Sequence, residues 1–289
     1  MSIRGLFVPL ITPFTAAGEV DYGVLERLAH EAVDAGAAGI VALGTTAEPA
    51  TLDAEERAAI VNTCAEVCGE REVALIVGTG SNSTADSERA LAGLDPRATA
   101  ALTVVPYYTK PSQRGIVEHF RRLAAASPVP LVIYNVPHRT GRPLDVETLR
   151  ELAELPNIAA FKHAVGAVDE TTVAWMATVG ERTSVLCGDD LFTAALLALG
   201  ADGAILTCSN VATADYVELV DAWHDGRVEQ ARKIGNRLVP LARALFAEAN
   251  PVVVKGVLAA QGRIPAPCVR LPLLPACEES VTAALAALG

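Results

Sequence analysis

The chain has 289 residues, and its balance of 51% apolar and 20% charged residues predicts a folded globular protein with a sizeable core. Its formal net charge of −11 disfavours nonspecific binding to nucleic acid or anionic lipid, because both need clustered cations, and so favours small-molecule partners. No apolar run approaches the roughly 20 residues that a membrane-spanning helix requires.

The cysteines and histidines have neither the spacing of a disulfide framework nor that of a metal site. The six cysteines are scattered without a CxxC pair, and the five histidines form no HExxH motif. In a chain of this length such spacing predicts buried thiols in a reducing cytoplasm, and it argues against a metal enzyme.

Short apolar runs recur along the chain, each bounded by turn residues. They are continuous rather than alternating in polarity, as is typical of strands buried on both faces of a parallel sheet. The first run, within MSIRGLFVPLITPF, is interrupted by Pro9 and Pro13 and is followed by no small-residue cleavage site, so it is interpreted as a strand rather than a signal peptide. The eight runs are LFVPLIT from Leu6, GIVALG from Gly39, VALIVGT from Val73, AALTVV from Ala100, PLVIYN from Pro130, IAAFK from Ile158, SVLCG from Ser184 and GAILT from Gly203.

Amphipathic segments separate these runs. DYGVLERLAHEAVDAG and DAEERAAIVNTCAEVCG place apolar residues at i, i+3, i+4 and i+7, which predicts helices with one buried face. Aspartates stand at predicted helix starts and glycines at two predicted helix ends. The predicted N-caps are Asp21, Asp53, Asp145 and Asp169, and the predicted stops are Gly36 and Gly69.

Eight strand–helix units in succession predict an α/β fold, a (β/α)8 TIM barrel over residues 1–226. An open, doubly wound sheet is the alternative. Strand signals cease from about Arg227, and RVEQARKIGNRLVPLARALFAE, PVVVKGVLAAQG and SVTAALAAL predict helices there, with the proline-dense PCVRLPLLPAC before the last. Residues 227–289 are therefore expected to form a C-terminal helical extension of the barrel.

Active sites in such barrels collect at the carboxyl ends of the strands, and several strand ends of this chain are polar. The second strand is followed by GTTAE, the fourth by Tyr107 and Tyr108, and the fifth ends at Tyr134 and Asn135. The sixth ends at Lys162, within NIAAFKHAVG. The candidate site is therefore expected at this end of the barrel.

Lys162 is the most informative of these residues. The chain has only four lysines against nineteen arginines, so a lysine in an apolar strand indicates chemistry that arginine cannot perform. A desolvated lysine gives up its proton more readily than one in water and can then condense with a carbonyl, whereas a guanidinium stays protonated. The alternative is a lysine ion-paired inside the barrel.

Neighbouring strand ends offer the groups that a Schiff-base lysine needs. Tyr134 is placed to shuttle protons for carbinolamine formation and dehydration, and Thr45 offers a hydroxyl to that tyrosine. Backbone amides of the turn at Gly44 are placed to hold a carboxylate. The guanidinium of Arg139 can bind a second carboxylate through two parallel hydrogen bonds. Each residue also has a structural interpretation, as a barrel-lining aromatic, a turn former or a loop arginine.

The sequence resembles the dihydrodipicolinate synthase/N-acetylneuraminate lyase family of pyruvate-dependent class I aldolases over nearly its whole length. The matching stretches, in order, are GLFVPLITPF, GTTAEPATL, VGTGSNST, VVPYYTKPSQRG, YNVPHRTG, the lysine in FKHAVG, CGDD, ANPVVVK and RLPLLP. The similarity is greatest to members that condense pyruvate with L-aspartate 4-semialdehyde in lysine and diaminopimelate biosynthesis. It implies a cytoplasmic lyase that needs no cofactor and assembles as a homotetramer, a dimer of dimers.

The resemblance also implies roles for eight residues. Lys162 would form the Schiff base with pyruvate, and Tyr134, Thr45 and Tyr108 match a proton-relay triad in which Tyr108 reaches a neighbouring subunit. The substrate-binding positions are Thr46 for the pyruvate carboxylate, Arg139 for the carboxylate of the aldehyde, and Gly188 and Ile205 as pocket-lining residues.

Several positions depart from the family pattern. Ala47 stands where members usually have glycine, and His163 stands where an acidic residue commonly follows the lysine. Both lie beside the predicted pocket and bear on the identity of the second substrate. Ala54 and Arg57 occupy positions where lysine-inhibited members carry histidines, which argues against feedback inhibition by lysine.

Three alternative functions remain at this point. A pyruvate-dependent aldolase or dehydratase acting on another 2-oxo acid, such as a sugar acid, keeps the chemistry and changes the acceptor. A nucleotide-binding oxidoreductase is suggested by VGTGSNS, which lacks the third glycine of a dinucleotide fingerprint. A non-catalytic regulator that binds a 2-oxo acid is disfavoured by the complete set of Lys162, Tyr134, Thr45 and Tyr108.

Overall fold

Eight parallel strands, hydrogen-bonded in chain order, close into a barrel. The computed structural model describes residues 3–180 and 182–288, so the two ends of the predicted barrel-plus-extension, residues 1–2 and 289, lie outside the described residues. Every predicted strand is present, which confirms the (β/α)8 fold. The strands are β1 Gly5–Pro9, β2 Gly39–Ala42, β3 Ala74–Gly78, β4 Ala100–Val104, β5 Leu131–Asn135, β6 Ile158–His163, β7 Ser184–Cys187 and β8 Gly203–Ile205.

The chain divides into two compact units. Unit 1 comprises Met1–Gly5 and Ile76–Ile205, and unit 2 comprises Leu6–Leu75 and Leu206–Gly289. The helices of unit 1 are α3 Thr84–Ala92, α4 Gln113–Ala126, α5 Pro137–Thr140, α6 Val146–Glu154, α7 Glu170–Met176 and α8 Thr193–Ala198, with the 3-10 helix η3 at Asp190–Phe192. Those of unit 2 are α1 Tyr22–Asp34, α2 Ala54–Glu70, α9 Thr213–His224, α10 Val228–Leu245, α11 Val252–Ala260 and α12 Glu278–Leu288, with 3-10 helices η1 Thr45–Ala47, η2 Pro49–Thr51 and η4 Cys208–Asn210. The division after residue 226 stays a prediction.

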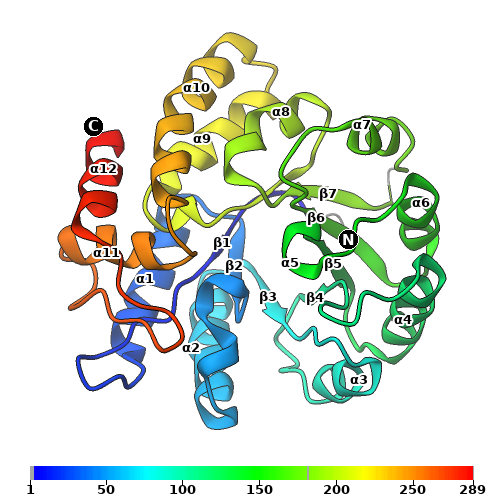
Figure 1. Ribbon diagram of the computed structural model, residues 1–289, viewed down its shortest axis with the longest axis horizontal. Helices are drawn as coiled ribbons and strands as arrows, with labels where there is room; N and C mark the ends of the chain where they lie inside the picture. Colours follow the sequence, from blue (N-terminus) through cyan, green and yellow to red (C-terminus); the bar gives the residue numbers. More distant parts are fainter. Residues whose placement is uncertain (1–2, 181, 289) are drawn as a thin grey trace. The chain divides into compact units, whose positions relative to one another are not determined.

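In unit 1 the helices lie along the outer face of strands β4 to β7, as Figure 1 shows for α3, α4, α6 and α7. The strands are buried on both faces, which is why their sequences are continuously apolar. Helix α7 packs on β6 through Trp175, whose ring meets Phe161 edge-on with centroids 4.9 Å apart. This contact fixes one side of the strand that carries Lys162.

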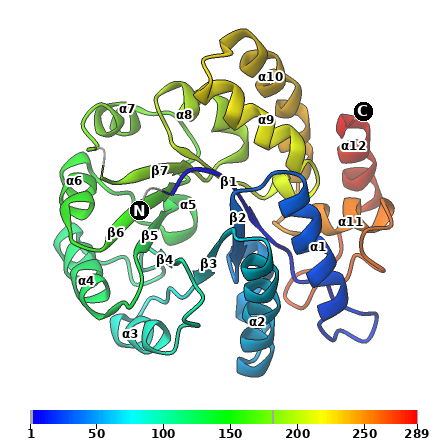
Figure 2. The ribbon, with the colours of Figure 1, turned by 180° about the vertical axis from the view of Figure 1, so that it is seen from behind.

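In unit 2, helices α9 and α10 lie side by side in both views (Figures 1 and 2). Asn210 ties η4 to the segment that follows β1. Its Nδ2 donates to the carbonyl oxygen of Pro9 at 2.9 Å, and its Oδ1 accepts from the backbone N–H of Ile11 at 3.2 Å. One buried amide thereby bonds to two backbone groups, one at the end of β1 and one just after it.

The predicted helix starts are confirmed. Each of Asp21, Asp53, Asp145 and Asp169 is an N-cap whose side chain accepts a backbone N–H three residues later. Asp53 forms a full capping box with Glu56.

One of the two predicted helix ends is correct. Gly36 has a left-handed φ of 94° directly after α1, and the N–H of Ala37 bonds back to the carbonyl of Ala32, as in a Schellman end. Gly69 does not end α2, because the helix continues to Glu70 and the left-handed residue is Glu72, with φ 54°. The N–H of Val73 closes that end on the carbonyl of Cys68.

The cysteines are all free within the described part of the chain, but they are not all buried. Four are buried, whereas Cys268 is half-buried and Cys277 is exposed near the start of α12, so the prediction of buried thiols is wrong for these two. Burial raises the pKa of Cys187 to about 12 and that of Cys68 to about 11. Among residues 3–180 and 182–288, no helix has both the length and the apolar character to cross a membrane.

Two glycine-to-alanine substitutions should shift stability in opposite directions. At Gly39, at the start of β2, an added Cβ would overlap the backbone carbonyl of Ala74, which cannot move aside cheaply. We expect Gly39→Ala to lower the free energy of unfolding by about 1–3 kcal/mol. At Gly69 nothing lies within 4 Å of the added carbon, and alanine favours the helix. Gly69→Ala should therefore raise the free energy of unfolding by about 0.5–1 kcal/mol. Chemical denaturation measures both, and equal shifts of the same sign would contradict the packing described.

Candidate active site

Lys162 and Tyr134 come together in unit 1. They are directly paired across strands β5 and β6, so their side chains point to the same face of the sheet. Lys162 is 5% exposed and Tyr134 is 8% exposed, and Nζ of the lysine lies 4.3 Å from the centroid of the tyrosine ring. A primary amine and a phenol are thus held side by side, shielded from water, near the carboxyl ends of two neighbouring strands.

The predicted pocket-lining residues also end strands of unit 1. Gly188 follows β7, and its N–H donates to the carbonyl of His163 at 2.8 Å. A Cβ at this position would stand 2.8 Å from Cγ of Lys162 and 2.9 Å from Cβ of Ala164, so only glycine leaves room for the lysine. Ile205 is the last residue of β8 and is fully buried.

Asp189 is a carboxylate of this region that sequence reasoning did not single out. Its Oδ2 accepts from the backbone N–H of Gly166 at 2.5 Å. Burial raises the pKa of the Asp189 carboxyl group, while the hydrogen bond from the Gly166 N–H and the electrostatic influence of His138 and Lys162 oppose that rise. The residue lies in the CGDD stretch, which a closer look at acidic groups beside strand ends would have identified.

Arg139 and Tyr108 lie in exposed parts of unit 1. Arg139 belongs to the single-turn helix α5, which follows β5 directly and ends at Gly141 in a left-handed conformation, φ 67°. Tyr108 is 87% exposed and has a left-handed φ of 67°, which is costly for a residue with a Cβ. Its side chain therefore points outward rather than packing against the rest of the chain.

Thr45 and Thr46 belong to unit 2, in the 3-10 turn η1 that follows β2. Thr46 is buried, and its Oγ1 lies 3.1 Å from Oγ1 of Thr207. Asn250 donates from Nδ2 to both hydroxyl oxygens at 3.1 Å. The turn is also held at Ala47, whose carbonyl accepts from Oγ1 of Thr12 at 2.7 Å.

Thr207 and Asn250 were not predicted as site residues. Asn250 belongs to the ANPVVVK stretch, and its position beside a proline was the only local signal. Asn250 and Thr46 are 204 positions apart in the chain, so no local sequence pattern predicts their contact.

His163 lies on the opposite face of β6 from Lys162, because successive strand residues alternate between faces. Its ring packs 5.1 Å from that of Trp175, and its Nε2 lies 3.0 Å from Oγ1 of Thr172. The Thr172 hydroxyl in turn donates to Oδ1 of Asp169 at 2.7 Å, so it accepts from the histidine. Burial lowers the pKa of His163 to about 4, against the opposing charge of Asp169, which keeps the ring neutral. The expectation that His163 stands beside the pocket is wrong for its side chain.

The arrangement in unit 1 is suited to covalent capture of a carbonyl compound. An amine can attack the carbonyl carbon, and the adjacent phenol can pass the protons that addition and dehydration require. The glycine at position 188 leaves room for the side chain of the lysine.

Comparison with known proteins gives a consistent result. A model of the dihydrodipicolinate synthetase family matches residues 2–288. The chain is 41% identical over 288 residues to the 4-hydroxy-tetrahydrodipicolinate synthase of Moorella thermoacetica, covering 98% of this chain and 96% of that one. It is 40% identical over 278 residues to the enzyme of the same name from Methanothrix thermoacetophila, covering 96% and 93%.

Solved structures agree with these sequence matches. The 4-hydroxy-tetrahydrodipicolinate synthase of Methylacidiphilum fumariolicum superposes with a TM-score of 0.94 at 35% identity, covering 99% of this chain and 95% of that one. The dihydrodipicolinate synthase of Thermotoga maritima gives a TM-score of 0.95 at 34% identity, covering 100% and 98%.

The buried His163 makes stability depend on pH. Its pKa in the folded chain is about 4, against an ordinary value of 6.5, so between these values the unfolded chain binds a proton that the folded chain does not. The free energy of unfolding must then fall as the pH falls from 6.5 towards 4, by roughly 3 kcal/mol for this residue at about 1.4 kcal/mol per pKa unit. We expect His163→Gln to flatten this dependence, measured by urea unfolding at pH 7.5, 6 and 5. If the free energy of unfolding changes equally with pH in the two proteins, His163 is already protonated in the folded chain.

Proposed function

The chain belongs to the dihydrodipicolinate synthetase family, and we propose that it condenses pyruvate with L-aspartate 4-semialdehyde, the activity of a 4-hydroxy-tetrahydrodipicolinate synthase in lysine and diaminopimelate biosynthesis. The observation that supports this reaction is the pairing of buried Lys162 with Tyr134 across β5 and β6. The enzyme is a lyase that works through an intermediate bound to its own lysine.

The chemical steps follow from that pair. Neutral Nζ of Lys162 attacks the keto carbon of pyruvate, and the resulting carbinolamine loses water to give an iminium. The cationic nitrogen then accepts the electron pair released when a methyl proton leaves, which produces an enamine. The enamine carbon attacks the aldehyde carbon of the second substrate, whose oxygen takes up a proton. The iminium itself is the electron sink, so these steps call on no further cofactor.

Proton transfer is assigned to three residues. Tyr134 stands beside the amine and exchanges the protons of carbinolamine formation and dehydration. Thr45 and Tyr108 complete the relay. The resemblance supports this assignment, and the outward display of Tyr108 suits a residue that serves a neighbouring subunit.

Substrate carboxylates are assigned to two further positions. The turn at Thr46 takes the carboxylate of pyruvate, and Arg139 takes that of the semialdehyde through the paired N–H groups of its guanidinium. Gly188 and Ile205 line the pocket. The contact of Gly188 with Lys162 supports this role, because a Cβ at position 188 would stand 2.8 Å from Cγ of the lysine.

We further propose that the protein works in the cytoplasm as a homotetramer built of two tight dimers. The scattered cysteines and the exposed Tyr108 support these proposals. Sedimentation velocity tests the assembly, and a monomer at working concentration would contradict it.

Borohydride trapping tests the Schiff base. We expect reduction in the presence of pyruvate to add one pyruvate-derived group per chain, on Lys162, as measured by intact mass and peptide mapping. Lys162→Ala should remain unmodified, and Lys110, exposed in the same unit, offers a matched control in Lys110→Ala, which should still be trapped. An unmodified wild-type protein would refute the mechanism.

A panel of aldehydes tests the acceptor. With pyruvate present, we expect turnover of L-aspartate 4-semialdehyde in preference to sugar-derived aldehydes. Loss of a charge-assisted contact is worth about 1.5–3 kcal/mol, so Arg139→Ala should lower kcat/KM for the semialdehyde by roughly 10- to 150-fold while leaving the pyruvate adduct on Lys162 intact. Turnover of a sugar acid aldehyde without turnover of the semialdehyde would favour the alternative acceptor, to which Ala47 already points as a departure from the family pattern.

A further inference from the structure

Glu48 holds the end of the turn that contains Thr45 and Thr46 in a strained conformation. Its backbone is left-handed, with φ 55° and ψ 42°, and it joins η1 to η2 in unit 2. A non-glycine residue adopts this conformation at a cost, so the surrounding contacts must hold it there. The side chain of Glu48 is only 2% exposed, which places those contacts in the interior of the unit.

Lys255, on helix α11, supplies the main contact. Its side chain is fully buried, and Nζ lies 2.5 Å from Oε1 of Glu48 and donates to the carbonyl oxygen of Cys268 at 2.8 Å. The same nitrogen lies 4.1 Å from the centroid of the Phe14 ring. The second carboxylate oxygen, Oε2, accepts from the backbone N–H of Arg270 at 3.1 Å. Both oxygens of Glu48 are therefore committed, and its carboxylate has no freedom to turn.

The charges of this pair are matched in the interior of unit 2, where both side chains are buried. Burial lowers the pKa of Lys255 to about 8, while the Glu48 carboxylate opposes the change. A buried ammonium bonded to a buried carboxylate is stable only while both partners remain. The pair is therefore a firm link between α11 and the turn.

The start of the same helical segment holds the turn at a second point. Asn250, two residues before α11, donates to Oγ1 of Thr46 and to Oγ1 of Thr207, each at 3.1 Å. The side chain of Thr46 is thus fixed from residue 250, and its backbone is fixed through Glu48 from residue 255. Two contacts from one segment define the position of the turn.

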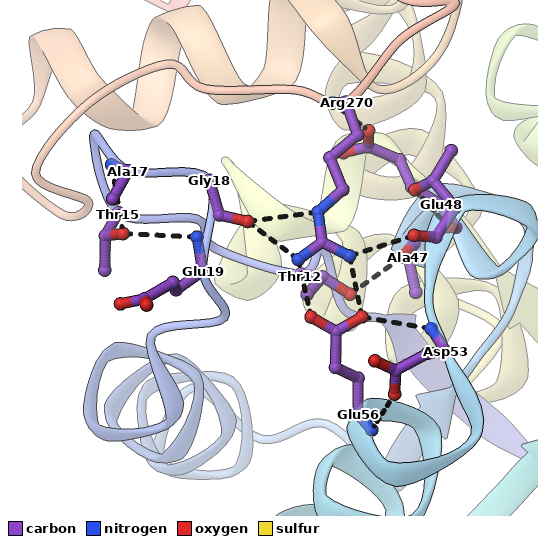
Figure 3. Close-up of polar contacts among 11 residues, drawn as sticks. Thr12, Thr15, Ala17, Gly18, Glu19, Ala47, Glu48, Asp53, Glu56 and Arg270 are labelled. Carbon is purple, nitrogen blue, oxygen red and sulfur yellow. Dashed lines mark hydrogen bonds and ion pairs between the residues drawn. The ribbon is translucent and has the colours of Figure 1, made fainter.

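A second ion pair near the turn provides a comparison. Figure 3 shows the Arg270 guanidinium between Glu56 and the carbonyl of Gly18. It bonds Glu56 through Nη1 at 2.7 Å and Nη2 at 2.5 Å, and its Nη1 also donates to the carbonyl of Thr51. The guanidinium and the Glu56 carboxylate are partly exposed, and Glu56 belongs to the N-terminal cap of α2 rather than to the turn.

We propose that Lys255 is a positioning residue for the pyruvate carboxylate: its ammonium, through Glu48, holds the turn at Thr45 and Thr46 in the shape that receives the substrate. The inference rests on the proposed function of that turn. It assigns to Lys255 of α11, whose ammonium is bonded to Glu48 and to the carbonyl of Cys268, control over the affinity for pyruvate rather than over the chemistry at Lys162.

The experiment measures the pyruvate concentration that gives half-maximal borohydride trapping on Lys162, together with KM for pyruvate, kcat and thermal stability. In Lys255→Met the turn loses its anchor, and we expect the half-maximal concentration and KM to rise at least tenfold, with full trapping at saturating pyruvate. Glu48→Gln, which leaves a lysine able to lose its proton, should fold readily and raise both values severalfold. Glu56→Gln removes the comparison pair, and it should lower stability while leaving both values within twofold of wild type.

The double variant Lys255→Met/Glu48→Gln separates positioning from general stability. It leaves no unpaired buried charge, so we expect stability to recover relative to Lys255→Met while pyruvate affinity stays weak. Wild-type pyruvate affinity in the double variant or in Glu48→Gln would overturn the proposal, including in the event that Lys255→Met does not fold. If wild-type protein itself shows no adduct on Lys162, the proposed function fails, and that outcome is distinct from a failure of the positioning role.

Discussion

A lysine side chain taken out of water must find a counter-charge or lose its proton, and this chain buries two of them. Lys255 is fully buried, and the carboxylate of Glu48 is its counter-charge. Lys162 is 5% exposed, and its Nζ lies 4.3 Å from the centroid of the Tyr134 ring. The first arrangement is a fixed ion pair in unit 2, and the second holds a primary amine beside a phenol in unit 1. The two buried lysines of this chain are thus held by different kinds of partner.

The strands could be predicted from the sequence because a strand that is buried on both faces is a continuous run of apolar residues. A strand such as LVIYN is apolar throughout until the carboxyl end, where the fold places its polar groups. Lys162 stood out for the same reason, since a lone lysine in IAAFKH has no compositional explanation in a protein that otherwise uses arginine. The helix N-caps could also be predicted, because each aspartate lies only three residues before the backbone N–H from which it accepts a hydrogen bond.

The contacts that support the candidate site could not be predicted in this way. Lys255 and Glu48 are 207 positions apart, and Asn250 and Thr46 are 204 apart, so only the folded chain brings them together. Gly69 shows the limit on a smaller scale. A glycine near the end of an amphipathic run is the usual stop signal, yet the backbone turns left-handed three residues later, at Glu72.

His163 shows how a departure from a family pattern changes meaning once its side chain is placed. In the sequence, His163 follows the lysine that is predicted to form the Schiff base, and this position suggested a change in the second substrate. The pleat of β6 turns it to the outer face, where it packs on Trp175 and bonds to Thr172, the residue that the Asp169 cap holds at the start of α7. His163 also contacts the end of β5, because its Nδ1 lies 3.4 Å from Nδ2 of Asn135. Ala47 lies inside the turn beside Thr46 and Glu48, so a change of substrate preference would have to be sought there first.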